Sequence, residues 1–296
     1  MNYRIQKNTI LIAGSHTSGG KAVKMMFAKH PGYRILETKN DLDISDAEAV
    51  KGFADMAYPN IIINCMSLPA PVGVQEDQLS DQEKRDLKKE LYRVNALGAA
   101  NLASVSRSHN AEIIHVSDAS VYSGALPNEF VEYDHNYGKS LYAKSRVAGE
   151  NQVKELNPKH MIIRVGTPYG SRKNPDDLYR QIVEQGRNNE PLHLTVTQWG
   201  QPTSVLTIAS VIKEAIDHAE YGIYHVADKG NPTLKEFARE VLAANDLNPD
   251  LAANLSEEGN GIVLEDLVRQ MRGKKELPDW KADLDAYVAS RKEARA

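Results

Sequence analysis

The sequence lacks most features that would place the chain outside the ordinary globular proteins. Its 296 residues include a single cysteine, Cys65, so no intramolecular disulfide and no thiolate zinc cluster can form. The formal net charge of −4 lacks the basic excess of a general nucleic-acid or membrane-surface binder. No apolar run could span a bilayer, and the N-terminal run is too short for a signal peptide. We therefore expect a cytoplasmic protein that binds neither nucleic acid nor membrane.

The histidine spacing and the overall composition also give no sign of a specialised class of protein. The nine histidines show no metal-site spacing, and we expect no metal. There are no internal repeats and no low-complexity tract. The apolar content of 41% and the charged content of 26% are typical of a soluble globular protein. The length suits one large α/β domain, alone or with a small partner domain.

Short apolar runs alternate with helical patterns from the start of the chain to about residue 165. Runs typical of buried strands occupy 8–14, 33–37, 60–65, 111–117 and 159–165. Between 81 and 109, apolar residues recur at helical spacing, namely Leu87, Leu91, Val94, Leu102 and Val105. Strands this apolar need cover on both faces of their sheet. The pattern therefore predicts an α/β fold with a Rossmann-like, doubly wound parallel sheet.

The character of the sequence changes after about residue 166. Turn residues become frequent, and short predicted strands at 191–196 and 222–227 lie among helices. We interpret 1–166 as an NAD(P)-binding Rossmann-like domain. We interpret 167–296 as a smaller substrate-binding lobe, interleaved with the sheet and capping its carboxyl edge. Ligands of such folds bind in the crevice at that edge.

A glycine-rich turn, "GSHTSGG", follows the first predicted strand and opens the first helix. Small residues let backbone N–H groups approach a pyrophosphate, and the helix N-terminus adds partial positive charge. The candidate cofactor-binding residues here are Gly14, His16, Thr17, Ser18, Gly19 and Gly20. Thr17 stands where a third glycine would complete the spacing, and its hydroxyl could donate to a phosphate. The alternative is a strand-to-helix turn that happens to be rich in small residues.

Loops after the next strands supply further cofactor candidates. An acidic residue after the second strand would bind an adenosine ribose, and a basic one a 2′-phosphate. The sequence offers both Glu37 and Lys39, so the choice between NAD and NADP is not readable. The remaining loop candidates are Asp43, Ile44, Cys65, Met66 and Ser67. The alternative for Asp43, and for Asn64, is a helix or strand cap.

Several separated motifs resemble one protein family. They include "LDISD" (42–46), "RVNALGAANLA" (93–103), "IHVSDASVYSG" (114–124), "YAKSRVAGE" (142–150), "IIRVGTPYG" (162–170) and "GIYHVADKGNPTLKEFAREVL" (222–242). Along nearly the whole chain they resemble the extended short-chain dehydrogenases/reductases, in particular the dTDP-4-dehydrorhamnose reductase family. The resemblance implies hydride transfer from NADPH or NADH to a 4-keto nucleotide sugar. A Tyr protonates the developing alkoxide, a Lys four residues on lowers the Tyr pKa, and a Ser or Thr binds the carbonyl.

Two of the three catalytic positions depart from the family pattern. Tyr142 matches the acid, Arg146 stands at the Lys position, and Asp118 stands at the Ser/Thr position. Arg146 keeps the positive charge but cannot relay a proton. An ionised Asp118 donates no hydrogen bond and would repel an alkoxide. Asp118 and Arg146 could instead form an ion pair that consumes both groups.

Other positions follow from the same resemblance. Asn95 joins Tyr142 and Arg146 among the cofactor-binding candidates. Ser117 and Ser120 flank the site and could supply the missing hydroxyl. The substrate-binding candidates are completed by Arg164, Gln198 and Trp199. The alternative for Arg164 is fold maintenance, and the alternative for Trp199 is packing.

Two functions are consistent with these residues. The first is an NAD(P)-dependent reductase of a nucleotide-sugar-like carbonyl, with Tyr142 as proton donor. The second is a catalytically inactive NAD(P)-binding regulatory protein, because the regulatory β subunit of methionine adenosyltransferase also resembles this family. A nucleotide-sugar-like small molecule is the expected partner, and a homodimer is one option for the assembly.

Overall fold

The computed structural model describes residues 8–38, 42–69, 75–123, 128–170, 177–194, 199–257 and 262–293. Six strands form one parallel sheet in the order β2-β1-β3-β4-β6-β9. They are β1 (Asn8–Ala13), β2 (Tyr33–Glu37), β3 (Ile61–Asn64), β4 (Glu112–Asp118), β6 (His160–Val165) and β9 (Gly222–Val226). The predicted doubly wound parallel sheet is thereby confirmed. Each of these six strands agrees with its predicted bounds to within a residue or so at either end.

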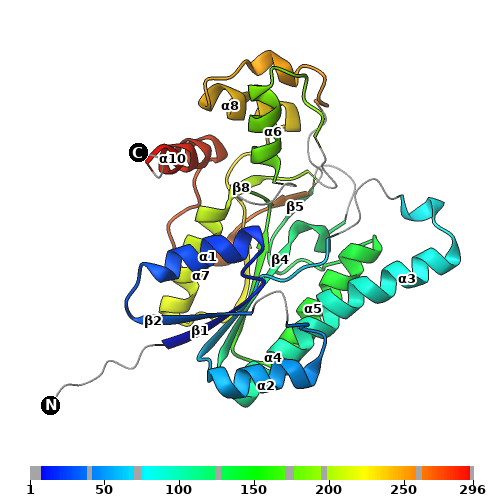
Figure 1. The fold of residues 1–296 in the computed structure, drawn as a ribbon, viewed down its shortest axis with the longest axis vertical. Coiled ribbons are helices and arrows are strands. Elements are labelled where there is room, and N and C mark those ends of the chain that lie inside the picture. Colours follow the sequence, from blue (N-terminus) through cyan, green and yellow to red (C-terminus); the bar gives the residue numbers. More distant parts are fainter. Residues whose placement is uncertain are drawn as a thin grey trace.

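Helices cover both faces of the sheet (Figure 1). The helices α1 (Ser18–Ala28) and α7 (Val205–His218) pack on one face. The other face carries α2 (Ala47–Ala57), α4 (Ala99–Ser108) and α5 (Leu141–Leu156). Strand side chains alternate between these two layers, as the pleat requires. In β1, Ile10 and Ile12 face the α1/α7 layer, whereas Leu11 and Ala13 face the α2/α4/α5 layer.

The segment predicted as one helical face between 81 and 109 is interrupted. Helix α3 (Asp81–Tyr92) runs through a π-helical turn at Arg93–Gly98 into α4. A π turn inserts extra backbone and rotates the apolar face of the helix that follows. As a result Leu91 and Leu102 are buried while Leu97 is exposed. Periodicity alone does not reveal such a turn, because the apolar residues on either side keep helical spacing.

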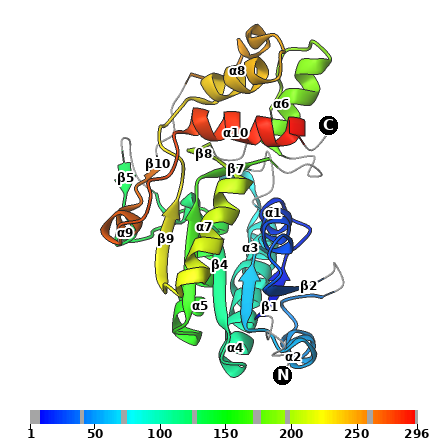
Figure 2. The ribbon, with the colours of Figure 1, turned by 90° about the vertical axis from the view of Figure 1, so that its left-hand side faces the viewer.

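The residues after β6 contribute to two layers. Strand β9 and helix α7 belong to the main sheet and its cover. Helices α6 (Leu178–Arg187), α8 (Leu234–Ala244) and α10 (Trp280–Glu293) form a separate apolar cluster beyond the carboxyl ends of the strands (Figures 1 and 2). The domain boundary at residue 166 stays a prediction. The short strand predicted at 191–196 is absent from residues 191–194, and the rest of it lies outside the described residues.

Short elements complete the carboxyl edge. The strands β7 (Thr167–Tyr169) and β8 (Pro202–Ser204) pair in parallel, and so do β5 (Asn128–Phe130) and β10 (Ile262–Leu264). Helix α9 (Leu267–Met271) follows β10, and 3₁₀ turns occupy Glu76–Gln78, Ala119–Val121 and Pro249–Ala252. Within the described residues, no helix has both the length and the apolar character needed to cross a membrane.

Candidate active site

Tyr142, Asp118 and Arg146 meet at the carboxyl end of β4. Ser140 caps α5, so Tyr142 lies in the first helical turn and Arg146 lies one turn further on the same face. The Tyr142 hydroxyl donates to Asp118 Oδ2 at 2.6 Å. Arg146 Nε donates to the same oxygen at 3.1 Å. The ion pair that the sequence raised as an option is therefore present, and it also holds the tyrosine hydroxyl.

Burial and charge act on Tyr142 against its use as an acid. The pKa of Tyr142 is raised above its usual value by burial and then by the negative charge of Asp118. The positive charge of Arg146 lowers it, but by less than the combined opposing effects. Arg146 is itself buried, and its Nη2 atom donates to the Val116 carbonyl. The Arg146 guanidinium is thus held by β4 and by Asp118. Its positive charge does not offset the effects that raise the pKa of Tyr142.

The glycine turn between β1 and α1 has the geometry of a phosphate-binding turn. Gly14 has a φ of +78°, and a Cβ there would lie 2.9 Å from the Cys65 carbonyl carbon. A Cβ on Gly20 would lie 2.1 Å from the Gly14 oxygen. Thr17 is the N-cap of α1: its hydroxyl donates to the Gly14 carbonyl at 2.8 Å and accepts from the Gly20 amide at 3.1 Å. That hydroxyl is therefore engaged within the turn, and the helix N-terminus supplies the partial positive charge.

The other candidates of this turn lie around it. Ser18 begins α1, Gly19 is half-buried and His16 is exposed. Since no amide of the turn is replaced by proline and the helix is 11 residues long, the residues present fit a pyrophosphate.

The loop after β3 lies between this turn and Tyr142. Asn95, from the π turn, accepts from the Leu68 amide at 2.8 Å and donates to the Leu68 carbonyl at 3.0 Å. It thereby holds the loop in place. Ser67 Oγ then lies 3.5 Å from the Tyr142 hydroxyl. The preceding Cys65 is buried, which raises the pKa of its thiol to about 12.

Two neighbours of this loop have plain local roles. Asn64, on β3, accepts from the Met66 amide at 3.0 Å and contacts His115 Nδ1 at 3.0 Å. This is the capping role that the sequence left open for Asn64. Met66 is half-buried against the α2/α4/α5 layer.

Two of the residues predicted to lie near the adenosine of the cofactor, Glu37 and Asp43, form ion pairs at the surface. Glu37 pairs with Lys24 at 2.6 Å. Asp43 accepts from Ser45 and pairs with Arg93 at 2.7 Å, and these bonds lower the pKa of its carboxyl. Ile44 is buried, and Lys39 lies outside the described residues. These cofactor assignments stay predictions.

The substrate-binding candidates separate into different surroundings. Ser117 and Ser120 are buried near Asp118, and their hydroxyls have no hydrogen-bond partner among the described residues. Trp199 packs against Phe237, and its Nε1 donates to the Pro232 carbonyl at 2.9 Å. Gln198 lies outside the described residues. The two serines thus have buried hydroxyls without a partner in the described part of the chain, whereas Trp199 is engaged in packing.

Arg164 lies in a buried network that the sequence pattern did not reveal. It donates to both carboxylate oxygens of Glu150, at 3.0 and 2.7 Å, and to the Tyr122 hydroxyl. Tyr122 in turn contacts His225 Nε2 at 2.8 Å. This geometry agrees with fold maintenance, and a substrate role for Arg164 stays a prediction. The glutamate of the "VAGE" motif, Glu150, could have indicated this network. The motif was used only to align Tyr142 with the tyrosine of the family.

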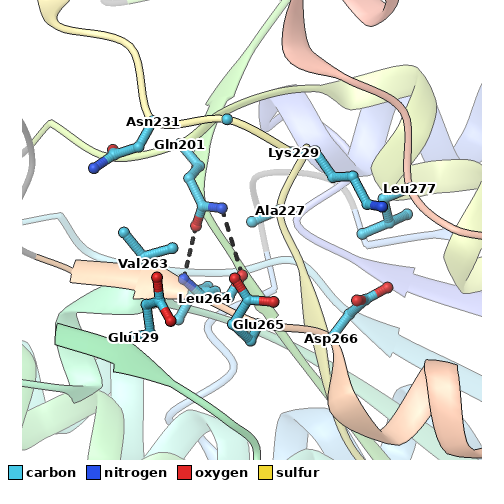
Figure 3. Close-up of a pocket in the computed structure, with 11 residues that line it drawn as sticks. Glu129, Gln201, Ala227, Lys229, Asn231, Val263, Leu264, Glu265, Asp266 and Leu277 are labelled. Atoms are coloured by element: carbon cyan, nitrogen blue, oxygen red, sulfur yellow. Dashed lines mark hydrogen bonds between the residues drawn. The ribbon is translucent and has the colours of Figure 1, made fainter.

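A cavity of about 410 Å³ at the carboxyl end of β9 was not predicted from the sequence (Figure 3). Its lining includes Gln201, Lys229 and Glu265. It does not include Tyr142, Asp118 or Arg146, so it is separate from the cluster described above.

Comparison with known proteins places this geometry in a family. The sequence profile described as "RmlD substrate binding domain" matches residues 8–290. A dTDP-4-dehydrorhamnose reductase of Aggregatibacter actinomycetemcomitans is 27% identical over 236 residues, which are 77% of this chain and 76% of that protein. A dTDP-4-dehydrorhamnose reductase of Mycolicibacterium smegmatis is 24% identical and covers 97% of this chain and 86% of its own length.

Solved structures agree on the fold. The crystal structure of a dTDP-4-dehydrorhamnose reductase from Clostridium acetobutylicum has a TM-score of 0.80 and 27% identity, covering 96% of this chain and 99% of that one. A Bacillus anthracis dTDP-4-dehydrorhamnose reductase in complex with NADP has a TM-score of 0.81 and 23% identity, covering 96% and 98%. With the profile matching almost the whole chain, the protein belongs to the RmlD substrate-binding-domain family, that is, the dTDP-4-dehydrorhamnose reductase family of the extended short-chain dehydrogenases/reductases.

Proposed function

We propose that the chain is an NAD(P)-dependent reductase of a nucleotide-sugar-like carbonyl, with slow turnover. The observation that carries this proposal is the position of Tyr142. It lies at the carboxyl edge of the sheet, with a cation one helical turn away and Ser67 at 3.5 Å. The relatives' names and the fit of the glycine turn to a pyrophosphate support the same interpretation.

Each residue has a defined task in this mechanism. A bound NAD(P)H supplies the hydride that reduces the carbonyl carbon. The N-terminal turn of α1 binds the cofactor pyrophosphate, and Asn95 holds the Leu68 loop beside it. Tyr142 gives its proton to the carbonyl oxygen as negative charge develops there. Ser117 or Ser120 donates a hydroxyl hydrogen bond to that oxygen, replacing the one that Asp118 cannot donate.

Slow turnover follows from the hydrogen bond between Tyr142 and Asp118. The tyrosine proton points at a carboxylate 2.6 Å away, and it must turn from this acceptor to reach a substrate. The tyrosinate left behind would then lie beside a second negative charge. The same observation favours a second candidate, an NAD(P)-binding regulatory protein that does not turn over.

Titration with NADPH and NADH, followed by nicotinamide fluorescence, tests cofactor binding first. We expect micromolar binding of at least one, and no binding of either would remove the reductase function. NADPH oxidation with a dTDP-4-keto sugar then compares the native chain with an Asp118→Thr/Arg146→Lys double variant. The proposed reductase predicts higher activity in the double variant, abolished again by adding Tyr142→Phe. Intact cofactor binding without activity in any variant would favour the regulatory protein.

A further inference from the structure

Ser67 is a second neighbour of the Tyr142 hydroxyl, besides Asp118. The tyrosine hydroxyl donates to Asp118 Oδ2 at 2.6 Å, whereas Ser67 Oγ lies 3.5 Å away from it. An O–H···O bond is strongest at about 2.8 Å, so the longer contact holds the serine proton only weakly. Within the described part of the chain, this contact is the one hydrogen bond of the Ser67 side chain. The Ser67 hydroxyl can therefore donate to a third oxygen that enters the site.

The two hydroxyls are spaced to share one oxygen of a ligand. Two oxygen atoms 3.5 Å apart can both lie about 2.8 Å from a third, which is the usual O–H···O distance. Asp118 ends β4, whereas Ser67 follows the neighbouring strand β3, so the two residues approach Tyr142 from different strand ends. A carbonyl oxygen on the Ser67 side of the tyrosine hydroxyl can thus contact both donors.

Exposure distinguishes Ser67 from the other two serines near the site. Ser117 and Ser120 are 1% and 6% exposed, whereas Ser67 and Tyr142 are both half-buried. Within the described residues, the hydroxyls of the two buried serines have no hydrogen-bond partner, whereas Ser67 contacts the tyrosine hydroxyl. A substrate therefore reaches Ser67 without displacing the side chains that bury Ser117 and Ser120.

Hydrogen bonds fix the position of Ser67 relative to Tyr142. Asn95 holds Leu68, the next residue along the loop, through the two bonds of 2.8 and 3.0 Å described above. Its Nδ2 atom also donates to the Ser145 hydroxyl at 2.9 Å, and this hydroxyl donates to the Tyr142 carbonyl at 2.6 Å. Asn95 is only 1% exposed, so water competes little for these bonds. The Ser67 loop and helix α5 are thus joined through one buried side chain, which keeps the two hydroxyls at a fixed spacing.

The effect of Ser67 on Tyr142 shows which way the serine hydroxyl acts. The pKa of Tyr142 is raised by burial and then by the Asp118 charge, and the Ser67 hydrogen bond acts in the opposite direction. A hydroxyl that lowers the pKa of a phenol does so by donating to the phenolate, because the ionised form gains more from the bond. The same donor would stabilise an alkoxide that develops beside the tyrosine.

We propose that Ser67 is a catalytic residue of the reduction, donating a hydrogen bond to the substrate carbonyl oxygen beside Tyr142, a role that rests on the proposed function. The carbonyl carbon takes the hydride of NAD(P)H, its oxygen takes the Tyr142 proton, and Ser67 keeps its own proton. The products are an alcohol, NAD(P)⁺ and a tyrosinate that is reprotonated from water. A developing alkoxide accepts more than one hydrogen bond, so the Ser67 bond adds to the one assigned to Ser117 or Ser120. The loop after β3 thus supplies a hydroxyl that the end of β4 lacks at Asp118.

Steady-state NADPH oxidation with a dTDP-4-keto sugar tests this role in two backgrounds. In the native chain, Ser67→Ala should lower kcat about 30-fold and leave KM within about twofold, because the lost bond forms in the transition state. Ser67→Thr keeps a hydroxyl and should retain most of the rate. In the Asp118→Thr/Arg146→Lys background the introduced threonine supplies another hydroxyl, so Ser67→Ala should lower kcat only about threefold. Ser108→Ala removes an exposed hydroxyl in the last turn of α4 and is the matched control, which should change neither constant.

NADPH titration and the phenolate absorbance of Tyr142 complete the test, and neither needs turnover. Ser67→Ala should leave the NADPH affinity unchanged and should raise the pKa of Tyr142, since a donor to the phenolate is lost. An unchanged kcat, an equal loss in both backgrounds, weaker NADPH binding that accounts for the loss, or an unchanged Tyr142 pKa would each overturn the role of Ser67 alone. Absence of NADPH oxidation in every chain, the double variant included, would instead overturn the proposed function and the role of Ser67 with it.

Discussion

Helix α5 contributes to two ion pairs one helical turn apart, and they differ in how completely they are closed. Glu150 receives two hydrogen bonds from Arg164, and the two side chains are 0% and 2% exposed. Asp118 receives one hydrogen bond from Arg146 and another from Tyr142, and its side chain is 23% exposed. The first pair is sealed inside the protein, whereas the second opens on the candidate active site.

This difference separates a pair that is closed within the fold from one that the proposed function uses. In the closed pair, each guanidinium nitrogen of Arg164 already donates to an acceptor within the protein. No nitrogen of this side chain is therefore left for a ligand. In the open pair, the Tyr142 hydroxyl shares one carboxylate oxygen with Arg146, and Arg146 Nη1 has no partner among the described residues. In the proposed function, a substrate therefore competes for the tyrosine proton at the open pair. Three variants test the contrast.

Breaking the closed pair should have the largest effect. Glu150→Gln leaves the buried Arg164 guanidinium without a counter-charge, and loss of one partner of a buried pair costs about 3–5 kcal/mol. Urea denaturation should show this loss as a lower midpoint. Glu184→Gln removes the carboxylate of the exposed pair with Arg180 and should change the midpoint little. A midpoint equal to that of the control would show that the closed pair is not structural.

A buried carboxyl that lies beside a second carboxyl should make the stability of the protein depend on pH. Asp228 is fully buried, and burial followed by the nearby Asp283 carboxyl raises its pKa to about 10. The native state then keeps a proton that the unfolded chain releases above the ordinary pKa of 3.8, so stability falls as pH rises from about 4 to 10. The slope can reach about 1.4 kcal/mol per pH unit. Asp228→Asn should flatten it, and denaturation at pH 5 and pH 9 measures the change. An unchanged slope would mean that another group causes it.

The smallest effect on stability is expected at the open pair. Asp118→Asn keeps an acceptor for Tyr142 but removes the counter-charge of the buried Arg146, and it should cost less than Glu150→Gln because the Asp118 carboxylate is partly exposed. The same change should lower the pKa of Tyr142, since the Asp118 charge raises it. Phenolate absorbance, taken as a difference from Tyr142→Phe, measures that shift. A Tyr142 pKa that does not move would argue against the Asp118 charge as the cause of the proposed slow turnover.

Much of the fold was predictable because strand burial leaves a strong signal. The five apolar runs before residue 166 and the run at 222–227 are all strands of the main sheet. The π turn at Arg93–Gly98 was not predictable, because it changes the direction of side chains without changing their spacing. The strand predicted at 191–196 is absent from the described residues 191–194, so a short apolar alternation was a weak signal there.

The candidate site was predictable in its residues but not in its geometry. Tyr142, Arg146 and Asp118 were identified from motif positions, and their ion pair was one of several options. Only the distance between the end of β4 and helix α5 could show whether Arg146 is left to contact a cofactor or is paired with Asp118. The cavity beside β9 had no sequence signal, because Gln201, Lys229 and Glu265 come from three segments far apart in the chain.

The sequence by itself determined the parallel sheet and the glycine turn. It also determined that the altered tyrosine motif resembles the motif of a reductase family. These depend on local hydrophobicity, on backbone freedom at Gly14, and on spacing within single elements. Only the tertiary structure decided which charges pair. Ion pairs and cavities form between elements, so the packing of β4, β6 and α5 against one another decides that the Glu150–Arg164 pair is closed and the Asp118–Arg146 pair is open.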